Sequence, residues 1–509
     1  MSTHRFRFVL GCGIPLFLLI GSGNFVSASQ SDYTARISAL IRASPELQQA
    51  HIGYLFADAD SGKVLAELNS SQLFTPASNR KLYVTALALI RLGPGYKFKT
   101  DLRTSQPWRP GQTVLHGLEL VGGGDPNLSG RVLPYSANAR DRDPLAVINE
   151  LADKLASYGI REIDGDVTGI ADRYPGDRFP LDWTLEDSMY GYGAPVSALT
   201  LDDNTISLTV SPTEPGELAS LELSPEVDYF TILNQVMTDR SSATEIHARR
   251  LPGSNELILW GTIGKQAKPW KQDFAVDDPA LFAAEALISA LEDRGITVRG
   301  TARSHYIDPN GAAPSPTIPA ERTVLASHES QPLWEDIQLI NKVSENLHAE
   351  MLLREVGFIQ NGLGTLNSGL DAETAFLKQA GLYGNPPPVS FFDGCGLARQ
   401  DLTTPASLVA LLRYMWQSPY RDLWVQMLPV GGVDGTLQNR FQGIPGAQRV
   451  HAKTGTVEHV RTLSGYMETP RHHWIAFSIL VNAASAEGSE ITKFIDQVCA
   501  LFLERESWP

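Results

Sequence analysis

Hydrophobic and polar positions near the two ends of the chain predict the strands and helices of one sheet domain. Residues 51–69 form two β-type runs around the turn sequence DSGK at 60–63, which is typical of a β-hairpin. Residues 449–468 and 473–483 read as neighbouring antiparallel strands, and residues 489–507 carry apolar side chains on one helical side. We therefore expect the first and last segments to form one antiparallel sheet with helices on both faces.

The middle of the chain divides into a β-type region and a helical region. Between residues 97 and 275, short β-type runs are split by glycine, proline, asparagine and aspartate, which predicts one or two inserted β-rich domains. In the helical region that follows, amphipathic helices are expected at 279–295, 333–357 and 404–417. The expected fold class is α/β (α+β), with a discontinuous domain of residues 29–96 and 276–509 interrupted by the insertion at 97–275.

The N-terminal residues have the composition of a secretory signal peptide. Arg5 and Arg7 precede an apolar run at 8–20, and a series of small residues ends at Ala28, where cleavage is expected. The apolar run is shorter than the roughly 20 residues that a membrane-spanning helix needs, although an uncleaved anchor is the alternative. We expect residues 1–28 to be removed and the mature protein to be periplasmic or secreted, with no stable membrane anchor.

Composition and charge exclude several classes of function. The 509-residue chain is 43% hydrophobic and carries a net charge of −15, so it lacks the basic surface of a nucleic-acid-binding protein. No cysteine–histidine cluster has the ligand spacing of a zinc site, and we expect neither a metal nor another cofactor. Signal cleavage would remove Cys12 and leave Cys395 and Cys499, which can pair only if the fold brings their Cα atoms within reach.

Three short motifs follow one another in an order that indicates nucleophilic catalysis. Ser78 and Lys81 lie three residues apart at the start of a predicted apolar helix, so their side chains share one helix face. Ser344 and Asn346 form a Ser-x-Asn segment, and Lys453 opens a Lys-Thr-Gly sequence on a predicted strand. Separately, the motifs also fit a helix cap, a helix start and a strand end. Together and in this order, they are the motif set of serine β-lactamases and penicillin-binding proteins.

The chemistry of the first motif requires a base beside the serine. A serine hydroxyl becomes a good nucleophile only when a base takes its proton, and Lys81 can do so only as a neutral amine. Lowering a lysine pKa by about 3 units, which makes it roughly half neutral near pH 7, corresponds to about 4 kcal/mol. Burial and a nearby cation both lower a lysine pKa. We hypothesise that Lys453 is that cation and that it also attracts a substrate carboxylate.

The second and third motifs offer groups that bind substrate and assist the leaving group. The hydroxyls of Thr454 and Thr456 suit a terminal carboxylate, and Gly455 would let a substrate backbone lie close to the strand. Ser344 would relay a proton to a leaving amine, and Asn346 would hold a substrate amide. The candidate site therefore draws on three distant parts of the chain.

With these motifs, the chain resembles the penicillin-binding protein 4 type of D-alanyl-D-alanine carboxypeptidases/endopeptidases over nearly its whole mature length. The resemblance implies a serine β-lactamase/transpeptidase-like domain, with inserted domains filling the long interval between Ser78 and Ser344. Cys395 and Ala398 stand where the family usually has serine, so we expect Cys395 to be a small buried residue and Asp393 to shape a loop. Further segments that carry the resemblance are GGGDPNL (122–128), APVSALTLDDN (194–204), DGCGLAR (393–399) and GGVDGTL (431–437).

The resemblance also implies a reaction. The protein would cleave the D-alanyl-D-alanine ends, or the D-alanyl cross-links, of peptidoglycan peptides through an acyl-serine intermediate at Ser78. The oxyanion hole would be the backbone N–H groups of Ser78 and Thr456, and β-lactam antibiotics would acylate the same serine as covalent inhibitors. Two alternatives are a β-lactamase, for which no candidate deacylating glutamate stands out, and a β-lactam sensor or cell-wall scaffold that never turns over.

Overall fold

The computed structural model describes residues 28–504, apart from 105, 140–141, 177, 252, 308–321 and 385–387. The expected signal peptide lies outside the described residues, except for Ala28. No helix in the described part of the chain combines the length and the apolar character needed to cross a bilayer.

A five-stranded antiparallel sheet joins the two ends of the chain. Its strands are β1 (His51–Asp58), β2 (Val64–Leu68), β17 (Val450–Val457), β18 (Val460–Glu468) and β19 (Trp474–Asn482). They lie in the order β17-β18-β19-β1-β2, so β19 pairs with β1, and His51 lies opposite Asn482. The predicted N-terminal hairpin and the predicted neighbouring strands near the C-terminus are both confirmed.

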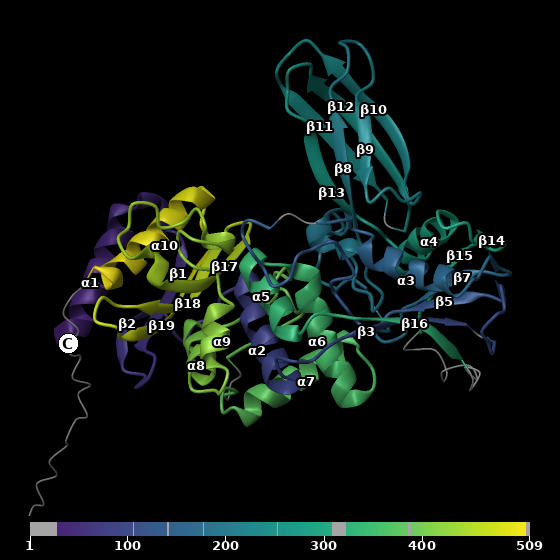
Figure 1. Cartoon of the computed structure of the whole chain (residues 1–509). Helices are drawn as coiled ribbons and strands as arrows, with labels where there is room; N and C mark the ends of the chain where they lie inside the picture. Colours follow the sequence, from purple (N-terminus) through teal and green to yellow (C-terminus); the bar gives the residue numbers. More distant parts are fainter. Residues whose placement is uncertain are drawn as a thin grey trace, which may run out of the picture.

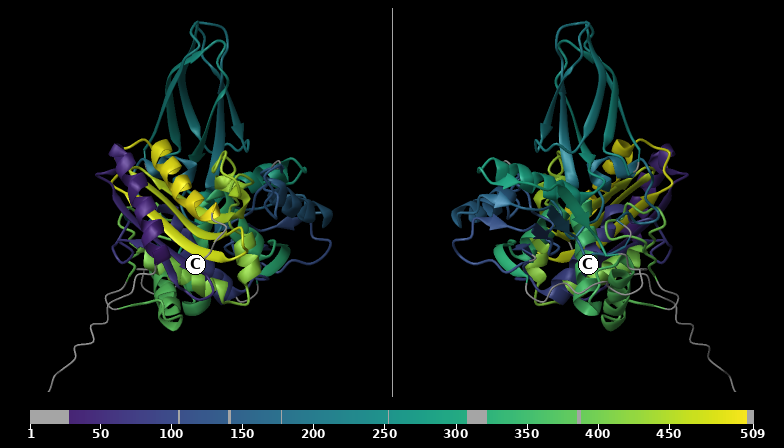
Figure 2. Two further views of the ribbon diagram at one scale, coloured as in Figure 1. Left: turned by 90° about the vertical axis from the view of Figure 1, so that its left-hand side faces the viewer. Right: turned by 90° about the vertical axis from the view of Figure 1, so that its right-hand side faces the viewer.

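Helices cover both faces of this sheet (Figure 2). On one face lie α1 (Ala28–Ala43) and α10 (Gly488–Leu503), which carry the first and last helical residues that the structure describes. Their apolar sides pack on the strands, where the rings of Phe56, Phe477 and Phe502 stack. The helical cover that the sequence predicts is therefore confirmed for this face of the sheet.

The other face carries a thicker helical layer. Its central helix is α2 (Lys81–Leu92), in which every residue from 82 to 89 is buried because the sheet lies on one side and further helices lie on the other. The helix α8 (Pro405–Trp416) packs directly on the sheet. Two more helices of this layer are α7 (Leu366–Gln379) and α9 (Arg421–Gln426).

The helical segment predicted at 333–357 is broken into two helices. The first, α5 (Leu333–Val343), ends where Ser344 adopts a left-handed backbone conformation with a φ of 68°. The second, α6 (Asn346–Asn361), begins two residues later. Periodicity does not reveal this break, because apolar residues keep helical spacing on both sides of it. The Ser-x-Asn motif therefore lies at the junction of two helices.

The insertion consists of two parts (Figure 1). The first is a mixed sheet of β3 (Lys99–Thr104), β5 (Leu118–Val121), β7 (Val167–Ile170), β15 (Ala302–His305) and β16 (Thr323–Glu329), in the order β15-β7-β5-β3-β16. The helices α3 (Ala146–Ser157) and α4 (Pro279–Glu292) pack against each other and on this sheet. Three short strands form a small parallel sheet beside it: β4 (Val114–Leu115), β6 (Glu162–Ile163) and β14 (Thr297–Val298).

The second part of the insertion projects away from the rest of the molecule (Figure 1). It contains two three-stranded sheets, β10-β12-β11 and β13-β8-β9. Their strands are β8 (Thr205–Ser211), β9 (Ser220–Ser224), β10 (Thr231–Asp239), β11 (Thr244–Arg250), β12 (Glu256–Gly264) and β13 (Trp270–Ala275). This part is β-rich as predicted, whereas the first part also contains helices.

The inserted region continues past residue 275, the end predicted from the sequence. The strands β14, β15 and β16 come after α4 and pair with β6, β7 and β3 of the insertion. Residues 276–329 therefore belong with the insertion rather than with the terminal sheet. The helical spacing at 279–295 shows that a helix forms, but it carries no information on which sheet that helix covers.

The insertion packs directly against α6. Leu347 and Met351 of α6 are buried in the apolar core of the insertion, together with residues such as Leu199 and Leu201. The segment that carries Ser344 and Asn346 is therefore in contact with both parts of the molecule.

Candidate active site

The turn before α2 presents Ser78 beside Lys81. Ala77 has a left-handed backbone conformation with a φ of 47°, and the short 3-10 turn that it starts leads directly into α2. The Nζ atom of Lys81 lies 2.8 Å from the Oγ atom of Ser78, as the spacing of three residues predicts. Asn79 donates a side-chain hydrogen bond of 2.9 Å to the backbone carbonyl of Lys453, which anchors the turn to β17.

Lys81 is fully buried among oxygen atoms. Its Nζ atom lies 2.8 Å from Ser78 Oγ, 2.6 Å from Asn346 Oδ1 and 2.7 Å from the carbonyl oxygen of Cys395. Burial lowers the pKa of Lys81, while nearby negative groups such as the Asp393 carboxylate oppose part of this change. In the neutral amine, two N–H groups can donate to Asn346 and Cys395, and the lone pair faces the Ser78 hydroxyl. Neutral Lys81 can accept the hydroxyl proton of Ser78 in this arrangement, as a general base must.

Lys453 is the second buried amine of the site. Its Nζ atom donates to the Oγ atom of Ser344 at 2.8 Å and to the carbonyl oxygen of Thr454 at 2.9 Å. Burial and, after it, the charge of Lys81 hold the pKa of Lys453 well below its usual range. Burial is the main cause of the lowered pKa of Lys81, and burial followed by repulsion from Lys81 lowers the pKa of Lys453. Because this repulsion is mutual, it favours a state in which one of the two amines has lost its proton.

The predicted residues meet in one pocket of about 400 Å³. The walls include side chains from all three motifs: Ser78, Ser344, Asn346, Thr454 and Thr456. Lys81 and Lys453 lie behind this wall and each bonds to one of its serines. The motifs are separated by hundreds of residues in the sequence, and the fold brings them together.

Several other residues of the pocket are not predicted from the sequence motifs. The inserted region contributes Asp187 and Tyr192, and the backbone carbonyl of Tyr192 accepts a hydrogen bond of 2.7 Å from Asn346 Nδ2. Both ends of the Asn346 amide are thus engaged within the protein, so holding a substrate amide would require an exchange of partners. The DGCGLAR and GGVDGTL segments, which carry the resemblance, supply Arg399 and Thr436, whereas no sequence signal marks Asp187 or Tyr192.

A family comparison agrees with this geometry. The model of the D-Ala-D-Ala carboxypeptidase 3 (S13) family matches residues 33–501. The chain belongs to this family. It is 33% identical over 488 residues to a D-alanyl-D-alanine carboxypeptidase of Actinomadura sp. (strain R39), covering 93% of this chain and 85% of that protein. It is 25% identical over 456 residues to the D-alanyl-D-alanine carboxypeptidase DacB of Haemophilus influenzae, covering 88% of both proteins.

Solved structures show the same fold. The crystal structure of penicillin-binding protein 4 (dacB) from Haemophilus influenzae aligns with a TM-score of 0.77 at 23% identity, covering 92% of this chain and 99% of that chain. A second structure of that protein, in complex with a β-lactam, aligns with a TM-score of 0.72 over 92% of this chain and 100% of that chain. The fold is therefore a transpeptidase-like domain with inserted domains, and the protein is a hydrolase of the D-Ala-D-Ala carboxypeptidase family.

In this carboxypeptidase, packing within the protein explains why residue 455 is a glycine, whereas the sequence alone suggests close approach of a substrate backbone. A Cβ atom at Gly455 would lie 2.1 Å from Thr462 Oγ1, 2.7 Å from the carbonyl oxygen of Pro76 and 3.1 Å from the backbone nitrogen of Ser78. The missing side chain therefore lets β17 lie against the turn that carries Ser78. This contact with the turn accounts for the glycine without any contact to substrate.

We expect Gly455→Ala to slow acylation by roughly tenfold or more, because a shift of about 1 Å at a catalytic group costs up to 100-fold in rate. The rate of covalent labelling by a fluorescent penicillin measures this effect. As a control, Gly95→Ala lies on the turn after α2, where an added Cβ meets nothing within 4 Å, and it should label at the wild-type rate. Equal labelling rates for the two variants would contradict the prediction.

The loop of residues 393–399 is shaped by Asp393, as predicted. Its carboxylate accepts backbone hydrogen bonds of 2.7 Å from both Gly396 and Ala398. Cys395 is fully buried, and both it and Cys499 are free thiols, so no disulfide joins them. Among the described residues, Asp393 and Cys395 also lie near Glu350 in a spacing that could hold a metal, but the Glu350 carboxylate accepts the Gly394 and Cys395 N–H groups and serves the same loop.

Proposed function

We propose that this carboxypeptidase hydrolyses the D-alanyl-D-alanine ends and the D-alanyl cross-links of peptidoglycan peptides through an ester of Ser78. The observation that carries the proposal is the contact of 2.8 Å between Lys81 Nζ and Ser78 Oγ, in a pocket that Ser344 and Asn346 also line. Membership of the D-Ala-D-Ala carboxypeptidase family supports the choice of substrate.

The first step is acylation. Neutral Lys81 takes the hydroxyl proton of Ser78 while Oγ bonds to the carbonyl carbon of the penultimate D-alanine. The developing oxyanion is stabilised by the backbone N–H groups of Ser78 and Thr456, and one such donor is worth about 3–4 kcal/mol in another serine hydrolase. Asn346, which is bonded to Lys81 at 2.6 Å, holds the base in place.

The second step is departure of the terminal residue. The amine of the last D-alanine takes the proton of the Ser344 hydroxyl as its C–N bond breaks, and the neighbouring Lys453, 2.8 Å away, supplies a proton to Ser344. The terminal carboxylate binds at the hydroxyls of Thr454 and Thr456. Water then attacks the ester: Lys81 returns its proton to Ser78 Oγ as the ester bond breaks, and the proton lost by the water passes through Ser344 to Lys453, so that both amines regain their starting states.

A β-lactam follows the same first step, because its strained amide takes the place of the D-alanyl bond. We propose that β-lactam antibiotics acylate Ser78, in keeping with the β-lactam complex of the structurally similar Haemophilus influenzae protein. We also propose a periplasmic location, because residues 1–28 have the composition of an export signal.

Purified cell-wall peptides test this function. We expect the protein to remove one D-alanine from peptides that end in D-alanyl-D-alanine, and to convert cross-linked dimers into monomers, with the products identified by mass spectrometry. Repeated hydrolysis of nitrocefin without peptide cleavage would indicate a β-lactamase instead. A stable penicillin adduct without any peptide cleavage would indicate a sensor or scaffold.

A further inference from the structure

The backbone at Ser344 is held in a conformation that non-glycine residues rarely adopt. Its φ of 68° places it in the left-handed region, at the two-residue break between α5 and α6. Such a conformation persists when contacts around it determine it. The directions of the Ser344 and Asn346 side chains therefore depend on whatever holds Glu345, the residue between them.

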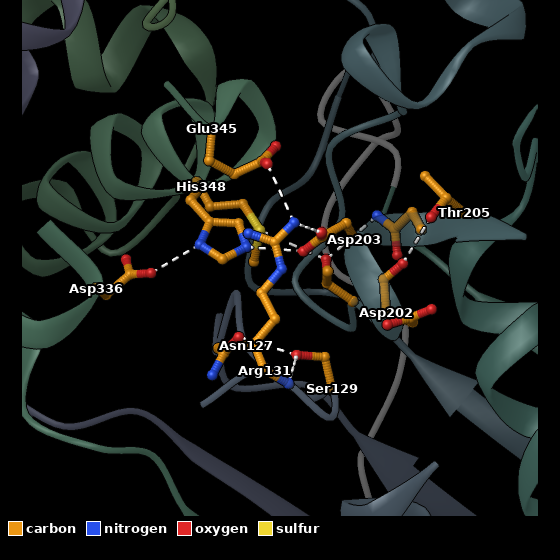
Figure 3. A network of polar contacts seen from close by, with 12 residues as sticks. Asn127, Ser129, Arg131, Asp202, Asp203, Thr205, Asp336, Glu345 and His348 are labelled. Atoms are coloured by element: carbon orange, nitrogen blue, oxygen red, sulfur yellow. Dashed lines mark hydrogen bonds and ion pairs between the residues drawn. The ribbon is translucent and has the colours of Figure 1, made fainter. Parts of the chain in front are cut away.

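Glu345 is tied to the inserted region. Its carboxylate accepts a hydrogen bond of 3.0 Å from the backbone N–H of Asn346, which caps the start of α6. The same carboxylate lies 3.3 Å from the guanidinium of Arg131, which also bonds to Asp203 (Figure 3). Both Arg131 and Asp203 belong to the insertion, so an ion pair from that region reaches the middle of the Ser-x-Asn motif.

His348 makes a second connection one turn further along α6. It is fully buried, with Nδ1 2.7 Å from the Asp336 carboxylate of α5 and Nε2 2.9 Å from the Asp203 carboxylate (Figure 3). Two carboxylate acceptors require an N–H group on each ring nitrogen, which only the imidazolium has. Burial alone would lower the pKa of His348, but Asp336 and Asp203 raise it to about 10.

These contacts form one series of alternating negative and positive charge around the helix break. Its members, in order, are Glu345, Arg131, Asp203, His348 and Asp336. Asp203 is its centre, because it accepts from Arg131 on one side and from His348 on the other. Asp203 itself has a φ of 54° and lies between two other residues of positive φ, in the 3-10 turn Asp202–Asn204 of the LDDN segment. Asp203 of the insertion is thereby connected to α5 through Asp336, to α6 through His348 and to Glu345 in the break.

We propose that Asp203, acting through Arg131 and His348, positions Ser344 and Asn346 for acylation. The inserted region thus holds the catalytic segment in its working conformation. None of the three residues is assigned contact with substrate. This inference rests on the proposed function, because it takes Ser344 and Asn346 to act during acylation of Ser78.

Acylation kinetics separate a positioning role from a purely structural one. The final acylated fraction, measured by mass spectrometry, counts correctly folded sites, whereas the rate constant reports their geometry. We expect Asp203→Asn to lower the rate constant for penicillin acylation at least tenfold while the final fraction stays at the wild-type level. An unchanged rate constant would overturn the proposal, whether the final fraction is normal or reduced.

Two substitutions at Arg131 give an independent test at a partly exposed side chain. Arg131→Gln removes the cation between Asp203 and Glu345 and should also slow acylation, whereas Arg131→Lys keeps a cation and should recover most of the rate. The matched control is Arg294→Gln, which breaks an ion pair of 2.6 Å with Asp153 elsewhere in the insertion and should acylate at the wild-type rate. Equal rates for all three variants would overturn the proposal.

The pH dependence gives a signature that a structural role lacks. Besides Asp336 and Asp203, the charged groups around His348 include Asp125 in the loop after β5, whose pKa burial raises to about 6, and Arg131 and Glu345 of the same network. In Asp203→Asn the pKa of His348 falls from about 10 because one carboxylate is lost. The ratio of variant to wild-type rate should therefore decline as the pH rises through that lowered pKa, and a constant ratio would overturn the proposal.

If wild-type protein formed no adduct at Ser78, the proposed function itself would fail.

Discussion

Ser78→Ala is expected to abolish acylation by penicillin and to lower release of D-alanine by roughly 10⁴- to 10⁶-fold, as removal of the nucleophile does in other serine hydrolases. The reason is geometric, because Ser78 is the hydroxyl that faces both the buried amine of Lys81 and the pocket. Mass spectrometry of penicillin-treated protein should show no adduct. Release of D-alanine from a D-alanyl-D-alanine peptide, followed by mass spectrometry, should fall by the same factor.

Ser70→Ala is the matched control for this variant. Its hydroxyl lies on an exposed turn and donates to Glu67 at 2.7 Å, so its removal should leave acylation at the wild-type rate. Ser344 is the other serine of the pocket. An adduct on Ser344 in the Ser78→Ala protein would show that the assignment of the nucleophile is wrong.

Arg80→Ala should destabilise the protein by about 3–5 kcal/mol, because it leaves a buried carboxylate without its partner. Arg80 is fully buried and donates to both carboxylate oxygens of Glu373, at 2.6 and 2.8 Å. It also donates to the backbone carbonyl of Asp393 at 2.9 Å, and its guanidinium lies 3.8 Å from the ring centre of Phe391. Urea unfolding followed by fluorescence measures the change in the free energy of unfolding.

Arg91→Ala on the same helix provides the comparison. Arg91 donates to Gln379 at the surface, and loss of such a contact changes stability by about 0.5 kcal/mol or less. A loss below about 1 kcal/mol for Arg80→Ala would mean that Glu373 becomes neutral or reaches water at little free-energy cost.

The sequence predicts those parts of the molecule that depend on local pattern. The hairpin at 51–69 and the strands at 449–483 are recognisable because turn residues and alternating positions act over short distances. The site is predictable for another reason: Ser78, Lys81 and Ser344 belong to motifs whose chemistry needs those residue types in that order. Each of them lies at the pocket or directly behind it.

The features that the sequence does not predict depend on contacts between distant residues. The break at Ser344 is invisible because apolar spacing continues through it, and it is held partly by Arg131 of the insertion. The partner of Arg80 is Glu373, which no local pattern connects to it. The lowered pKa values of Lys81 and Lys453 depend on their burial and on how close the fold brings the two amines, which only the coordinates show.

The pairing of β1 with β19 has a consequence for biosynthesis. The central strands of the sheet come from distant parts of the chain, and Lys453 of β17 is made after both the insertion and the helical layer. A nascent polypeptide that still lacks β19 has an N-terminal hairpin with no neighbour on one side, and long-range pairings of this kind form slowly. We therefore expect a product that ends before β17 to be inactive, because it lacks Lys453 and the strands that complete the sheet.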